Sequence, residues 1–159
     1  MKREGNLMKR AGLVCMAALM LALPNCASMT IKPVDYSWSY ESVLKADSAG
    51  VVSGEPKTIS FDAGVLFRAE EGEQGTAANK TLRIIRDREG YYFVTAPGFK
   101  NVYIYDSAKG RLELHKKVLI AKEGMEKPFF NRRDQGIELG ANGQVYLLTR
   151  KGIVSGGKK

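Results

Sequence analysis

The chain has one histidine, His115, and Asp106 and Ser107 stand shortly before it. These are the residue types of a Ser-His-Asp triad, in which the histidine takes a proton from the serine hydroxyl. The Gly-x-Ser-x-Gly turn that exposes such a serine in many hydrolases does not occur in the sequence. Lys116 and Lys117 follow the histidine, and this setting is typical of a solvated strand end. We therefore predict no catalytic residues.

Metal-ligating residue types are equally sparse. A zinc site needs several His, Cys or carboxylate ligands, which one histidine cannot supply. Glu70, Glu71 and Glu73 form an acidic run with the oxygen ligands that calcium prefers, but the run lacks the regular aspartate spacing of a calcium-binding loop. We expect a polar, solvated loop here. We predict neither a metal, nor a cofactor, nor an enzymatic activity.

The stretch from Lys127 to Arg133 contains two adjacent aromatic residues, Phe129 and Phe130, followed by the cations Arg132 and Arg133. One interpretation is a binding loop, in which a phenylalanine anchors a membrane or partner and the arginines contact phosphate or carboxylate. The other is that one phenylalanine fills the end of the core while the arginines stay solvated. We take these four side chains as the candidate binding site.

Three aromatic residues alternate with serines near the start of the mature chain. Tyr36, Trp38 and Tyr40 are separated by Ser37 and Ser39, and this period of two predicts a half-buried strand. Such an aromatic face is typical of a strand that packs into the core. A sugar- or lipid-binding face would show the same pattern.

The N-terminus has the composition of an export signal. Lys9 and Arg10 precede an uncharged apolar run, Ala11 to Leu23, and small and polar residues follow it. The run is shorter than the roughly 20 apolar residues that a membrane-spanning helix needs. We therefore expect the segment to direct export and to be cleaved.

Cys26 stands at the end of this run, with Leu23 three residues before it. This arrangement resembles the lipobox of bacterial lipoproteins, in which the cysteine is lipidated and becomes the mature N-terminus. Asn25 departs from the small residue that is usual before the cysteine. The resemblance implies a lipid anchor at Cys26 and, because Ala27 is not aspartate, an outer-membrane location facing the periplasm if the organism is Gram-negative. Ordinary cleavage nearby or an uncleaved anchor are the alternatives.

Length and cysteine content limit the rest of the chain. Both cysteines, Cys15 and Cys26, lie in the N-terminal segment, so the following domain has no thiol for a disulfide and must be stabilised by packing. The remaining length suits one domain. The sequence predicts a signal peptide (1–25), a short lipidated tether (26–32), a β-domain (33–150) and a flexible basic tail (151–159).

The net charge of +8 is unevenly distributed. Residues 27–79 hold four basic and eight acidic residues, whereas residues 80–159 hold seventeen basic and eight acidic ones. A basic half on an exported protein suggests an anionic partner, such as lipid headgroups or an acidic envelope protein. We do not expect nucleic acid as a partner, because the predicted compartment excludes it.

Short runs of β-branched and aromatic residues, separated by glycine-containing turns, extend through residues 58–148. The run Val65 to Ala69 is expected to pair with residues 58–61 as a hairpin. Residues 46–56 and the stretch from Lys122 to Asp134 are expected to be irregular. The spacing predicts a mainly β fold, a single small antiparallel β-sandwich or β-barrel of about 8–10 short strands.

These observations favour a lipid-anchored protein of the bacterial cell envelope that acts as a non-enzymatic interaction or assembly accessory through a basic β-domain surface. The alternative is a ligand-binding β-barrel that carries a lipid or another hydrophobic molecule. An envelope hydrolase has the least support in the sequence.

Overall fold

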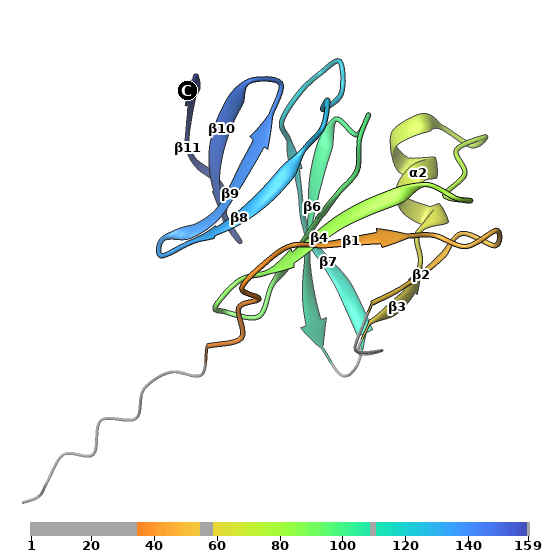
Figure 1. Ribbon diagram of the computed structural model, residues 1–159, viewed down its shortest axis with the longest axis horizontal. Coiled ribbons are helices and arrows are strands. Elements are labelled where there is room, and N and C mark those ends of the chain that lie inside the picture. Colours follow the sequence, from red (N-terminus) through yellow and green to blue (C-terminus); the bar gives the residue numbers. More distant parts are fainter. Residues whose placement is uncertain (1–34, 55–58, 109–110, 159) are drawn as a thin grey trace, which may run out of the picture. The chain divides into compact units, whose positions relative to one another are not determined.

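The computed structural model describes residues 35–54, 59–108 and 111–158, and these residues form eleven strands and one helix (Figure 1). The predicted signal peptide, the tether and Cys26 lie outside the described residues, so lipidation remains a prediction. In the part of the chain that is described, no helix has the length and apolar character needed to cross a membrane.

A five-stranded antiparallel sheet forms the centre of the fold. Its order is β1-β4-β5-β6-β7, with β1 at Ser42–Lys45, β4 at Thr81–Arg86, β5 at Tyr92–Thr95, β6 at Asn101–Ala108 and β7 at Arg111–Leu119. All four residues of the central strand β5 are buried. Both faces of this sheet are therefore covered at its middle.

A second sheet is formed by the last part of the chain. Its order is β11-β10-β9-β8, with β8 at Phe129–Arg133, β9 at Gly136–Ala141, β10 at Gln144–Thr149 and β11 at Gly152–Lys158. Ile137, Leu139 and Leu148 are fully buried, because they point from β9 and β10 into the core. A short hairpin of β2 (Val51–Ser53) and β3 (Ser60–Asp62) forms a third sheet.

The prediction of a mainly antiparallel β-domain is confirmed. The described strands form three antiparallel sheets, none of which closes into a barrel within the described ranges, as in a small β-sandwich. Large side chains fill the space between the layers, and Phe67, Phe93, Phe99 and Phe130 are each almost fully buried.

The two larger sheets are joined by residues 35–41, which we call the linking segment. The backbone N–H of Trp38 donates to the carbonyl of Arg86 at 3.0 Å, at the end of β4. The carboxylate of Glu41 accepts a hydrogen bond from the Arg83 guanidinium on β4 and, through its other oxygen, one from the Phe130 N–H on β8 at 2.9 Å. The linking segment thus connects β4 of the first sheet with β8, an edge strand of the second sheet.

The predicted hairpin at residues 58–69 is wrong, because its second half is the helix α2 (Gly64–Glu71). Leu66 and Phe67 on one face of α2 are buried, and the Phe67 ring packs edge-to-face against Phe99 with 4.8 Å between ring centres. Leucine, alanine and glutamate favour a helix. The burial of one helical face against the first sheet therefore outweighs the strand preference of Val65 and Phe67.

The expected strand containing Tyr36, Trp38 and Tyr40 is also wrong. Strand β1 begins only at Ser42, and the aromatic residues precede it in the irregular linking segment. Trp38 packs edge-to-face against Tyr92 at 5.6 Å, whereas Tyr40 is 84% exposed. The three rings therefore do not share one buried face.

Three segments expected to be irregular contain strands. Residues 46–56 include β2, the stretch from Lys122 to Asp134 includes β8, and the predicted flexible tail at 151–159 includes β11. In each case antiparallel pairing provides hydrogen-bond partners for the backbone N–H and C=O groups. Strand β2 pairs with β3, β8 with β9 and β11 with β10.

Candidate functional site

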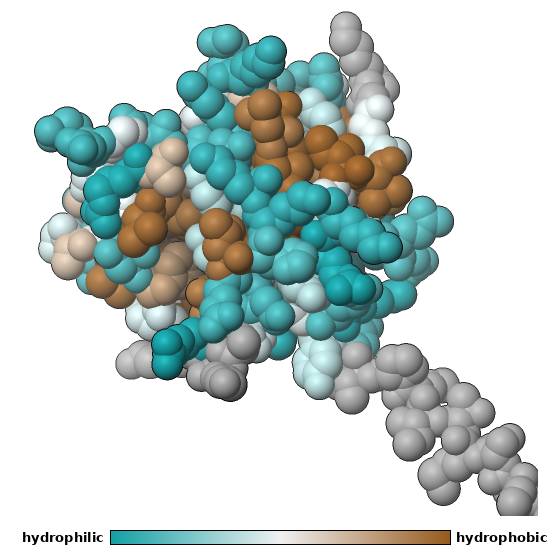
Figure 2. Space-filling model, turned by 180° about the vertical axis from the view of Figure 1, so that it is seen from behind, coloured by the Kyte–Doolittle hydropathy of each residue, from teal (hydrophilic) through white to brown (hydrophobic). Residues whose placement is uncertain are grey.

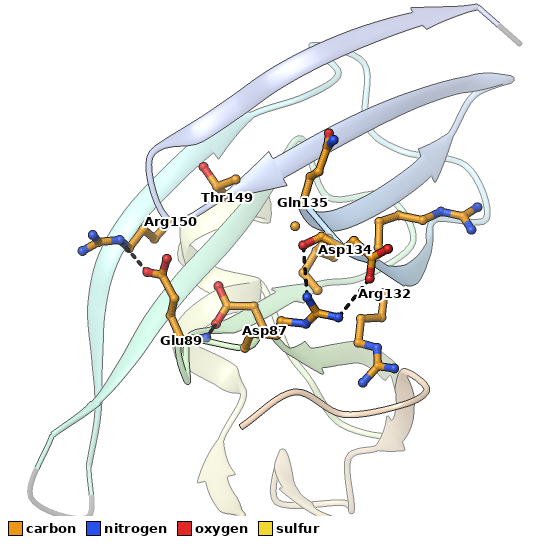
Figure 3. A pocket seen from close by; sticks show the side chains of 11 residues that line it. Asp87, Glu89, Arg132, Asp134, Gln135, Thr149 and Arg150 are labelled. Atoms are coloured by element: carbon orange, nitrogen blue, oxygen red, sulfur yellow. Dashed lines mark hydrogen bonds and ion pairs between the residues drawn. The ribbon is translucent and has the colours of Figure 1, made fainter. Parts of the chain in front are cut away.

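A surface cavity of about 160 Å³ lies where three hairpin turns meet, between β4 and β5, between β8 and β9, and between β10 and β11 (Figure 3). Two of the predicted binding residues, Arg132 and Arg133, line it. Its charged lining consists of four arginines and three carboxylates: Arg88, Arg132, Arg133, Arg150, Asp87, Glu89 and Asp134. We call this the arginine cavity.

Arg88, in the β4–β5 turn, contacts the β8–β9 turn across the cavity and the linking segment beside it. Its Nη2 atom lies 2.9 Å from Oδ1 of Asp134 in the β8–β9 turn, and its Nε atom lies 3.6 Å from Oδ2 of Asp35 in the linking segment. The ion pair with Asp134 is drawn in Figure 3. Arg88 is thus held by two carboxylates and fixes the position of both segments.

Arg150 closes the opposite side of the cavity. Its Nε atom lies 2.7 Å from Oε2 of Glu89 (Figure 3). Its guanidinium lies over the ring of Tyr91, 5.7 Å from the ring centre. The same ring packs against the imidazole of His115 on β7 at 5.1 Å. His115 therefore lies against an aromatic ring, while Ser107 pairs across the sheet with Leu112.

Asp87 shapes the β4–β5 turn. Its carboxylate accepts hydrogen bonds from the N–H groups of Glu89 at 3.0 Å and Tyr91 at 2.8 Å, and Gly90 takes the positive φ of 99° that completes the turn. Burial raises the pKa of Asp87, although these hydrogen bonds act in the opposite direction. Asp87 holds the turn that carries Arg88.

Arg132 differs from the other arginines of the cavity. Its Nη1 atom donates to the Ser37 hydroxyl at 2.8 Å, and among the described residues no carboxylate lies within ion-pair distance of it. Ser37 in turn donates from its hydroxyl to Asp35 at 2.5 Å, and its hydrogen bonds lower the pKa of Asp35. Arg132 also contributes to the lowered pKa of Asp35, so it is an exposed cation whose hydrogen bond goes to a neutral group while the nearby carboxylate stays beyond ion-pair distance.

The four predicted binding residues do not form one site. Arg133 pairs with Glu138 through two contacts of 2.9 Å, and Phe130 is buried in the core. Phe129 is 38% exposed at the other end of β8, where it lines a shallow groove with Val145. Figure 2, which views the molecule from behind, shows apolar side chains gathered on the surface around β8 to β11. Arg132 alone keeps the predicted role of an available cation.

The expectation of a solvated loop holds for Glu73, which lies in an exposed turn, and is wrong for Glu70 and Glu71, which end the helix α2. The Glu70 side chain is 2% exposed, and its carboxylate accepts hydrogen bonds of 2.7 Å from Lys100, Asn101 and Tyr103 around β6. Glu71 pairs with Lys80 at 2.7 Å. These carboxylates hold α2 against the first sheet, and protein donors occupy the oxygens that a cation would need.

The sequence pattern of Arg83, Arg86 and Arg88 is typical of a solvated strand edge and does not identify Arg88 as part of the site. Nothing in the sequence groups Arg150 and Ser37 with Arg132, because only the tertiary fold brings these residues together. A guanidinium presents a planar set of donors that matches a carboxylate or a phosphate group. The arrangement therefore suits recognition of an anion. No protein-family model, no curated protein and no solved structure matches this chain.

Proposed function

We propose that this protein is a lipid-anchored interaction accessory of the bacterial cell envelope, without enzymatic activity, that recognises an anionic partner through the arginine cavity. The lipid is attached to Cys26 and the protein faces the periplasm from the outer membrane of a Gram-negative cell. The partner is an anionic headgroup or an acidic envelope protein.

The observation that supports anion recognition is that Arg132, among the described residues, has no carboxylate within ion-pair distance. Its neighbours Arg88, Arg133 and Arg150 each lie within 2.9 Å of a carboxylate oxygen, so an anion gains little from them directly. Arg132 donates to the neutral Ser37 hydroxyl, and the Asp35 carboxylate acts on it only from beyond ion-pair distance. Replacing a neutral acceptor by a charged one strengthens the hydrogen bond by roughly 1 kcal/mol or more.

The position of the linking segment relates this site to the proposed anchor. Asp35 and Ser37, at the start of the described chain, contact Arg88 and Arg132. The nine residues from Cys26 to Val34 reach at most about 30 Å when fully extended. A lipid at Cys26 therefore keeps the arginine cavity within that distance of a membrane surface.

Anchoring is tested by the mass and membrane partitioning of the protein expressed in a bacterium. We expect the wild type to carry a diacylglyceryl group and to fractionate with membranes, and the Cys26→Ala variant to lose the modification. An unmodified wild type that stays out of the membrane fraction would contradict the anchor.

Anion recognition is tested by titrating the purified protein with inorganic phosphate and with acetate, while the backbone amide resonances of the cavity residues Arg88, Glu89 and Asp134 are followed by NMR. We expect a saturable shift that disappears in Arg132→Ala. Arg68→Ala is the matched control, since Arg68 is half-exposed and lies 4.0 Å from Asp62, outside the cavity. Vesicles with and without phosphatidylglycerol then separate a headgroup from a protein partner. Identical titrations of both variants would refute the site.

A further inference from the structure

Strand β7 forms one edge of the five-stranded sheet and pairs only with β6. It runs from Arg111 to Leu119, and all residues from Glu113 to Lys117 are exposed. Within the described ranges, no backbone hydrogen bond other than those of the β6 pairing involves these five residues. Half of their N–H and C=O groups therefore face away from β6, as on any edge strand.

Edge strands are usually protected against further pairing by proline, by a short length or by lysines that project past the edge. Strand β7 has nine residues and no proline. Its register against β6 shifts at His115, and a bulge can twist an edge away from a new partner, but regular pairing continues on both sides of it, at 111–114 and 116–119. The two lysines of β7 are drawn back over the protein's own surface. Lys117 Nζ lies 5.4 Å from the centre of the Tyr103 ring and 3.9 Å from Glu70, and Lys116 Nζ donates to the Lys151 carbonyl at 2.7 Å.

Apolar surface remains uncovered along the same strand. Leu114 is 55% exposed and Leu119 is 53% exposed. A strand placed beside β7 would pair with its free backbone groups and also cover part of both leucines. This combination is the one used when an extended peptide adds to the edge of a sheet.

The charges along β7 favour an acidic segment as the strand that pairs with it. Arg111, Lys116 and Lys117 outnumber the single carboxylate Glu113, and opposite charges on neighbouring strands stabilise a pair whereas like charges destabilise it. A second copy of β7 would bring these cations close to one another. An acidic segment would instead place carboxylates beside them.

We propose that the outer edge of β7 binds an extended segment of a partner protein in which carboxylate residues alternate with apolar ones. The segment adds as a sixth strand to the five-stranded sheet. To pair with its carboxylates, Lys116 and Lys117 turn away from the Lys151 carbonyl and from Glu70 toward the added strand. Its apolar side chains cover Leu114 and Leu119. This interaction requires neither the lipid anchor nor the arginine cavity.

The test is an NMR titration of the purified protein with a short peptide of alternating glutamate and valine, with amide hydrogen exchange of Glu113 to Lys117 as the readout. We expect saturable protection of the outward-facing amides and no protection by the peptide with lysine in place of glutamate. The double variant Lys116→Glu/Lys117→Glu should bind about tenfold more weakly, as expected for reversal of two charges.

The matched control is Lys45→Glu/Lys127→Glu, which makes the same charge change at two exposed lysines outside β7. Leu114→Ser is a second variant that leaves the charges intact and should also weaken binding. Equal protection by both peptides, or equal affinity of the β7 variants and the control, would overturn the proposal. Sedimentation that shows a dimer lost in the β7 double variant would overturn it in favour of pairing between two copies.

Discussion

Glu41 and Arg83 form an ion pair through which the linking segment is attached to the first sheet, and the second oxygen of Glu41 accepts the Phe130 N–H of the second sheet. The side chains of Glu41 and Arg83 are 17% and 26% exposed. Both oxygens thus face donors in a partly buried position. One carboxylate therefore connects three segments that are far apart in the sequence.

We expect Glu41→Gln to lower the free energy of unfolding by about 1–3 kcal/mol, since an amide keeps only one acceptor and leaves one of the two donors unpaired. Urea denaturation measures this loss. The control Arg68→Ala removes an exposed pair with Asp62 and should change stability by less than about 1 kcal/mol. Equal effects of the two variants would show that Glu41 does not connect the sheets energetically.

The attachment of α2 depends on another carboxylate, Glu70. Its buried oxygens accept three hydrogen bonds from residues around β6, so Glu70→Gln should cost about 2–3 kcal/mol. If the amides of α2 exchange faster in Glu70→Gln than in the wild type while those of β5 do not, the helix detaches locally. Glu71→Gln breaks only the half-exposed pair with Lys80 and should have a much smaller effect. A Glu70 variant that exchanges as slowly as this control would contradict the role of Glu70.

The strands were predictable where pattern and burial agree. In β4, Leu82 and Ile84 are fully buried while Arg83 between them is not, and this alternation is visible in the sequence. The eight-residue helix α2 is too short to show a clear helical period. Its main polar contacts come from Glu70 to residues 30 to 33 positions later in the chain. A local pattern carries no information about such contacts.

The candidate site was predictable only in part for the same reason. The composition of the Lys127 to Arg133 stretch identifies Arg132, but its partner Ser37 lies 95 positions earlier. Arg88 and Arg150 reach the cavity because three hairpin turns meet at one end of the two sheets. The flexible tail was expected from its glycines and lysines, and its pairing with β10 depends on a neighbour that composition does not reveal.

The Phe129 ring occupies the space over Gly140, its partner across β8 and β9. A methyl group on Gly140 would lie 2.2 Å from the ring. Gly140→Ala should therefore displace the ring, and because the ring is 38% exposed and can turn outward the cost should be about 1 kcal/mol, at the low end of the range for overpacking. In a Phe129→Ala background the same substitution should cost much less, because the ring is gone. A double-mutant cycle by urea denaturation measures the coupling, and additive costs would rule out the contact as its cause.

Burial raises the pKa of the Tyr105 hydroxyl above its usual value, which is about 10. Above that pH the unfolded chain loses the tyrosine proton while the folded protein retains it, so the unfolded state binds fewer protons and stability falls as pH rises. Tyr105→Phe removes this contribution. The unfolding free energy of the variant should decline less steeply between about pH 10 and the raised pKa of the folded state, by up to roughly 1.4 kcal/mol per pH unit.

Urea denaturation at a series of alkaline pH values, with tyrosinate absorbance recorded in parallel, measures this difference in slope. Tyr40→Phe is the control, because the Tyr40 side chain is 84% exposed and its hydroxyl meets water in both states. Burial and the hydrogen bond to Glu70 also raise the pKa of Tyr103, so part of the pH dependence should persist in Tyr105→Phe. If Tyr105→Phe and Tyr40→Phe have the same slope, Tyr105 ionises in the folded protein as readily as in the unfolded chain, and the hydroxyl is not buried.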